Sequence, residues 1–266
     1  MRPVFDRTAE DVGNIVGFGH VSLRVPDLRL ATLFYVVGLG LSSDPYRMAG
    51  AGTMWVHAGD GRFHLPTGPA QALRGIVGLV VPELAALRAR LDAVAPALAG
   101  TRFTWQDSGD AIDLVCPWGT RLRAHAPQPR FGAVTLGMPY VELDAPPGSA
   151  EAVARFYRET LHAVATAGED GRGRFARVTA GQSAVIMFRE TGMFRETGGT
   201  AGGTDANHIQ ITLADFSGPH RRLLARGLVT EETSQHQYRF QDVVDPDSGE
   251  VLVTIGHAVG SMRHPL

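Results

Sequence analysis

The sequence has little of several features that would assign a function directly. Its one cysteine, Cys116, excludes an intrachain disulfide and is typical of proteins from a reducing cytoplasm. No stretch reaches the roughly 18 consecutive apolar residues of a membrane helix, and residues 1–13 lack the apolar run of a secretory signal. A net charge of only −2 gives no general attraction to nucleic acid or to an anionic membrane. We therefore expect a cytoplasmic protein whose partner is a small molecule.

Motifs of common enzyme classes are missing as well. The sequence has no Gly-rich phosphate loop between a strand and a helix, no cysteine pair with zinc-ligand spacing and no Gly-x-Ser-x-Gly segment. Nucleotide-dependent and serine-hydrolase functions therefore have no support.

One short pattern is present four times along the chain. Residues 20–27 and 208–215 place a His seven residues before an Asp, while 76–83 and 140–147 repeat the frame with Ile and Tyr in place of His. Alternation in each copy predicts a strand with one apolar and one polar face. An amphipathic helix and about three further strands are predicted after each copy. Repetition at this scale indicates four similar modules.

The module resembles the βαβββ unit of the vicinal oxygen chelate superfamily, which includes glyoxalase I, bleomycin and fosfomycin resistance proteins and extradiol dioxygenases. The resemblance covers about residues 15–258. It is carried by the strand pattern His-Val-x-Leu-x-Val-Pro-Asp, by the helix pairs Phe34-Tyr35 and Phe156-Tyr157, and by Pro and Gly turns before the last strands. It implies an α+β fold in which four βαβββ modules pair into two cupped mixed-sheet domains.

We expect modules that follow one another in the chain to share a domain. The N-terminal domain, modules 1 and 2, is placed at 15–126, and the C-terminal domain, modules 3 and 4, at 132–258, because two prolines in 126–130 interrupt the pattern. A Gly-rich stretch between Arg189 and Asp205 predicts either a linker or a lid over the C-terminal cup.

The superfamily typically places metal ligands, often two His and one Glu, on the first and last strands of paired modules. The resemblance puts the last-strand acid four residues after a turn glycine, where this chain has Arg123 and Val253. No complete triad is expected in either cup. A bound ion would have at most two protein ligands at family-like positions, and we expect it to be weakly held.

Two substitute sites can be inferred. In the C-terminal cup, Glu142 is expected opposite His208, so these two are candidate metal ligands and catalytic groups. Candidate substrate-binding residues in the same cup are Tyr140, Gln210, His236 and Tyr238. In the N-terminal cup, His20 and His64 form an alternative metal pair. The same cup is expected to present Arg24, Arg62, Arg121, Arg123 and His125. A single His on a strand is, however, more often structural than a ligand.

Two functions of different classes remain open. The first is a metal-assisted enzyme, a lyase, isomerase or dioxygenase, that acts on a small oxygenated, aromatic or unsaturated compound with weakly held Fe, Mn, Zn or Ni. The second is a metal-free protein that sequesters a small molecule, as the resemblance to bleomycin resistance proteins implies. The strand pattern allows cups that close within one chain and cups that close in a homodimer.

Overall fold

In a computed structural model of the chain, the described residues are 11–46, 52–192, 207–233 and 237–263. Most of the segment for which we predicted a linker or a lid lies outside these residues.

Each module runs from one strand through a helix into further strands. Module 1 contains β1 (Ile15–Ser22), α1 (Leu28–Ala31), the π-helical η2 (Thr32–Gly38), β2 (Ser42–Ser43), β3 (Thr53–Ala58) and β4 (Gly61–Pro66). Module 2 contains β5 (Gly75–Val80), α2 (Leu84–Val94), η3 (Ala95–Leu98), β6 (Thr104–Asp107), β7 (Ala111–Val115) and β8 (Arg121–His125).

The second half of the chain repeats this order after the short helix η4 (Pro129–Phe131). Module 3 contains β9 (Gly137–Ala145), α3 (Ala150–Leu161), β10 (Ala165–Asp170), β11 (Gly173–Thr179) and β12 (Val185–Glu190). Module 4 contains β13 (His208–Leu213), α4 (Ser217–Ala225), β14 (Val229–Thr233), β15 (Gln237–Val244) and β16 (Val251–Ser261).

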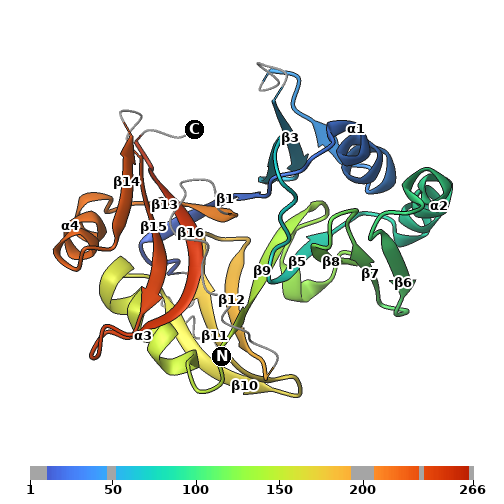
Figure 1. The fold of residues 1–266 in the computed structure, drawn as a ribbon. Coiled ribbons are helices and arrows are strands. Elements are labelled where there is room, and N and C mark those ends of the chain that lie inside the picture. Colours follow the sequence, from blue (N-terminus) through green and yellow to red (C-terminus); the bar gives the residue numbers. More distant parts are fainter. Residues whose placement is uncertain (1–10, 47–51, 193–206, 234–236, 264–266) are drawn as a thin grey trace.

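The strands form two mixed sheets of eight strands each, which confirms the predicted fold class (Figure 1). The first sheet has the order β14-β15-β16-β13-β1-β4-β3-β2, and the second has the order β10-β11-β12-β9-β5-β8-β7-β6. Each sheet therefore holds two modules, joined through their first strands.

The modules that share a sheet are not the ones we expected. β1 pairs antiparallel with β13, and β5 with β9, so module 1 shares a sheet with module 4 and module 2 with module 3. All four first strands carry the same alternation, so local sequence does not select between these partners. The domain division at 15–126 and 132–258 stays a prediction, and the sheets cross it.

The helices connect the modules that are neighbours in the chain. α2 packs against η2, and α3 packs against α4. The repeated Phe-Tyr pairs on η2 and α3 are fully buried and belong to one continuous apolar core. Sheet pairing and helix packing thus join each module to two others, which ties the four modules together.

Equivalent tyrosines in the two halves have different polar contacts. The Tyr157 hydroxyl lies 2.6 Å from Nε2 of His257, and both side chains are fully buried. The Tyr35 hydroxyl lies beside the thiol of Cys116, which is at most a weak hydrogen-bonding partner. Of these two contacts, only the Tyr157–His257 hydrogen bond, which joins modules 3 and 4, is therefore strong.

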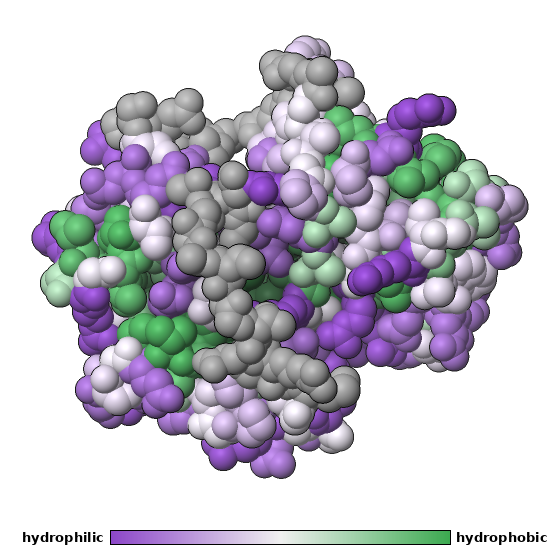
Figure 2. All heavy atoms as spheres, viewed as in Figure 1, coloured by the Kyte–Doolittle hydropathy of each residue, from purple (hydrophilic) through white to green (hydrophobic). Residues whose placement is uncertain are grey.

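The surface in Figure 2 carries its hydrophobic residues in several separate groups among hydrophilic ones. None of the helices in the described part of the chain combines the length and the apolar character needed to cross a membrane.

We expect Tyr157→Phe to lower the free energy of unfolding by roughly 1–3 kcal/mol, because it leaves the buried His257 nitrogen without its partner. Tyr35→Phe is the matched control and should cost clearly less. Urea denaturation of both variants measures the difference. Equal losses would show that the Tyr157–His257 hydrogen bond does not stabilise the protein more than the Tyr35 hydroxyl does.

Candidate functional site

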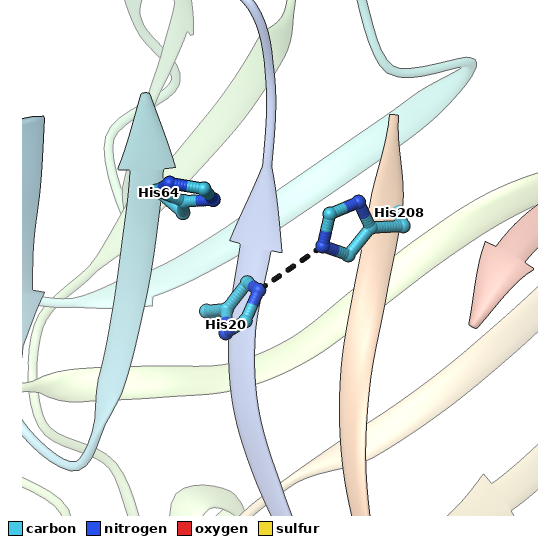
Figure 3. A group of neighbouring side chains, drawn as sticks. All are labelled: His20, His64 and His208. Atoms are coloured by element: carbon cyan, nitrogen blue, oxygen red, sulfur yellow. Dashed lines mark hydrogen bonds between the residues drawn. The ribbon is translucent and has the colours of Figure 1, made fainter. Parts of the chain in front are cut away.

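Three histidines come together on one face of the first sheet because β4, β1 and β13 are neighbours. Ser22 on β1 lies opposite His64 on one side and His208 on the other, and His20 precedes it by one pleat on the same face. The intervening Val21 is fully buried on the helix side. Strand alternation thus directs all three imidazoles to the same side of the sheet, as Figure 3 shows.

The spacing of the three imidazoles fits a shared cation. Nε2 of His20 lies 3.2 Å from Nε2 of His208, and one ligand nitrogen from each of the three rings lies within 4.8 Å of the others. Two nitrogens bound to one tetrahedral Zn²⁺ at 2.0–2.1 Å would be about 3.3 Å apart. The His20–His208 pair is already at that separation.

Two neighbouring side chains fix the orientation of His64. Its Nδ1 lies 3.1 Å from the Ser22 hydroxyl, a contact that orients the ring. The Trp55 ring stacks on the His64 ring at 4.1 Å and meets the edge of His20 at 5.0 Å. These contacts restrict the orientation of both imidazoles.

Burial keeps His20 uncharged. It is the main reason why the pKa of His20 lies well below its usual value, and the neighbouring His208 and His64 lower it further. Arg62 and Arg239 are near enough for their charges to act in the same direction. A neutral imidazole offers a lone pair, as metal coordination requires.

The symmetry of the paired modules identifies a fourth position in the cup. Ala258 stands opposite Gln210 on β16, as His64 stands opposite Ser22 on β4. We had placed this position at Val253, but Val253 is a buried core residue. The cup therefore has three imidazoles and one methyl group at the four equivalent positions. Three candidate ligands thus meet where the sequence predicted at most two, because module 1 shares the cup with module 4.

Two of the other predicted residues of this cup lie on different sides of the sheet. Gln210 lies opposite His20, and its amide oxygen covers Gly19, where a Cβ would meet it at 1.5 Å. Tyr238 instead packs against Phe216 and His220, with ring centroids 4.9 and 5.0 Å away. It thus belongs to the side covered by α4. His236 lies outside the described residues.

Glu142 and Tyr140 lie on the second sheet, so the expected convergence of Glu142 with His208 does not occur. β9 pairs with β5 and β12, and β13 pairs with β1 and β16. Arg172 donates to both oxygens of the buried Glu142 carboxylate, one of them at 3.0 Å. Glu142 is held in an ion-pair network instead.

Neither a family model nor a curated protein sequence matches this chain. Solved structures do match it over nearly its full length. Glyoxalase I from Zea mays aligns with 96% of this chain and 94% of its own, at 13% identity and a TM-score of 0.60. A Bacillus subtilis protein provisionally assigned as a dioxygenase aligns with 95% of this chain and 86% of its own, at 18% identity and a TM-score of 0.58.

The chain has the vicinal oxygen chelate fold. The cppA protein from Streptococcus pneumoniae shares the arrangement, at 10% identity and a TM-score of 0.52 over 95% of this chain and all of its own. At these identities the likeness establishes the fold and leaves the activity open.

In this vicinal oxygen chelate fold the second sheet does not repeat the histidine group. Its residues at the four equivalent positions are Ile76, Arg123, Tyr140 and Met187. The Tyr140 hydroxyl contacts Nε2 of His125 at 2.9 Å, and its ring lies against Gly78, where any Cβ would clash. Burial raises the pKa of Tyr140 to about 12 and lowers that of His125 to about 4. Both groups are therefore neutral near pH 7.

The arginines that we expected in one cup are divided between the two sheets. Arg24 and Arg62 belong to module 1, which contributes to the first sheet. Arg121 and Arg123 lie on β8 of the second sheet, beside Asp144 and Asp113 at 3.4 and 3.6 Å.

Sequence reasoning missed Trp55 and Ser22 as neighbours of the histidines. Their alternation with buried residues on β3 and β1 was the available signal.

We expect Glu142→Gln to lower the free energy of unfolding by roughly 1–3 kcal/mol, because it leaves the buried Arg189 guanidinium, 3.6 Å away, with less compensating charge. Glu151→Gln, which disrupts an exposed ion pair with Arg158, is the control and should cost at most about 0.5 kcal/mol. Thermal and urea unfolding measure both. If Glu142→Gln left the free energy of unfolding unchanged, the ion-pair network would not need this charge.

Proposed function

We propose that the chain is a metal-dependent enzyme of the glyoxalase or dioxygenase kind, with His20, His64 and His208 as the metal ligands. The observation that supports this most strongly is the meeting of three imidazoles from three adjacent strands within 4.8 Å. One of them, His208, is separated by more than 140 residues of chain from the other two. Three protein ligands with the remaining positions open is the usual composition of a catalytic metal site.

The donor set narrows the choice of metal. Imidazole nitrogens suit Zn²⁺, Fe²⁺, Ni²⁺ and related ions, whereas Mg²⁺ and Ca²⁺ prefer oxygen ligands. With three ligands rather than two, the ion should be held more firmly than the sequence alone led us to expect. The ions to test are therefore Zn²⁺, Fe²⁺, Mn²⁺ and Ni²⁺.

The residues around the histidines would bind and orient a small oxygenated compound. A divalent ion held by the three histidines would supply a Lewis acid that polarises substrate oxygens. Trp55 forms one wall and keeps the His64 ring in place. The Gln210 amide, opposite His20, adds a hydrogen-bonding group beside the ligands. The Ser22 hydroxyl holds the His64 Nδ1.

One observation favours a second candidate, a metal-free protein that sequesters a small molecule. The 3.2 Å between the Nε2 atoms of His20 and His208 is also a normal hydrogen-bond distance. In that case one ring donates its proton to the other, and the pair is complete without an ion.

Metal analysis of protein purified without a His tag distinguishes the two candidates. We expect about one equivalent of a divalent ion, or uptake of one equivalent of Zn²⁺ or Co²⁺ by chelator-treated protein. His64→Ala and His208→Ala should each weaken binding by at least about tenfold, since loss of groups that only support a ligand already costs 10- to 100-fold.

The matched control is His220→Ala, which removes a histidine on α4 that pairs with Glu232. It should keep the full metal content. If the unaltered protein took up no ion at micromolar concentrations, or if His220→Ala lost as much as the other variants, the proposed centre would be excluded.

A further inference from the structure

We propose that the compound bound in this cup is a small carboxylate anion, and that Arg62 binds its carboxylate. The inference rests on the proposed function and names the class of substrate that the same site would take. Its support comes from the charge of the ligand set and from the position of Arg62.

The ligand set carries no negative charge. The group formed by the described residues consists of three imidazoles, and the fourth equivalent position is Ala258. A divalent ion held by three neutral ligands keeps its full double charge, and in a partly buried cup such a charge strongly favours an anion. A set that contained a carboxylate would offset half of that charge before any substrate entered.

Arg62 is placed to add to this field. It precedes His64 by two residues on β4, so its side chain leaves the same face of the strand. It also lies opposite His20 across the β1–β4 pairing, where neighbouring strands are about 4.8 Å apart.

A second guanidinium in the same cup belongs to Arg239. Arg239 lies on β15, which is separated from β1 by β16 and β13. Arg62, by contrast, lies on the strand directly beside His20. We therefore assign the carboxylate contact to Arg62 and leave Arg239 as a contributor to the positive potential.

The chemistry of the guanidinium defines the ligand. Its planar fork of N–H donors matches the two oxygens of a carboxylate, which a lysine ammonium does not. The sequence contains no lysine, so every fixed positive side chain of the cup is a guanidinium. A short oxoacid could place one end on the metal and the other on Arg62.

The test compares oxalate with oxamide, a neutral molecule of the same size and shape. Protein loaded with Co²⁺ is titrated with each compound and followed by calorimetry and by the visible spectrum of the ion. The metal content is measured again afterwards to detect extraction. We expect oxalate to bind at least tenfold more tightly than oxamide.

Arg62→Gln should weaken oxalate binding by about 10- to 100-fold, the effect of losing a charge-assisted pair of hydrogen bonds. The metal content of this variant should stay the same. Arg88→Gln is the control, since it removes an arginine that pairs with Asp107 of module 2. It should leave oxalate binding unchanged.

The outcomes separate this inference from the proposed function. A protein that holds its metal but does not bind oxalate, or binds oxalate and oxamide equally, keeps the metal centre and overturns the anionic substrate. Unchanged oxalate binding in Arg62→Gln overturns the role of Arg62. If no metal is bound, the proposed function fails, and the same titrations on metal-free protein still decide whether Arg62 selects a carboxylate.

Discussion

The antiparallel pairing of β1 with β13 is the constraint on which the rest of the structure depends. It joins six residue pairs from opposite ends of the chain and closes two half-sheets into one sheet of eight strands. It also decides the chemistry, because His20 and His64 lie on one side of the join and His208 on the other. The buried Val21 and Ile209 opposite one another supply the apolar contact that holds this pairing.

The two sheets share one plan and differ in the polar face. On the helix side both carry the same elements of a core, including the buried Phe-Tyr pairs of η2 and α3. On the opposite face, the first sheet has three imidazoles and two nearby guanidiniums. The second has Glu142, Arg172, Arg189 and Asp170 joined in ion pairs that satisfy one another. The polar groups of the second sheet thus pair with one another within the protein.

Much of the fold could be predicted from the sequence, because strand alternation and helix amphipathicity are local. The choice between sheet partners could not be, since the four first strands are nearly interchangeable in pattern. That choice decided the site: His20, His64 and His208 were each identified as candidates, but assigned to two different cups. The error at Val253 has a local cause, because β15 and β16 change register twice and residue counting from the turn no longer applies.

Glu142 illustrates a different limit. Its position on the polar face followed from alternation, but its partner, Arg172, comes from the turn between β10 and β11. Nothing in the periodicity of either segment indicates that contact. A carboxylate that is costly to bury must have a partner, and the sequence does not say whether the partner is a metal or an arginine.

The order in which the chain is made gives the β1–β13 pairing a consequence during biosynthesis. His20 and His64 leave the ribosome on the order of ten seconds before His208, at ordinary rates of translation. Throughout that time β1 has an open edge with unpaired backbone groups, which is the usual starting point for wrong pairing between chains. A product that ends before residue 208 would keep that edge and lack one imidazole of the site. Completion of the three-histidine group and protection of the β1 edge are therefore the same event.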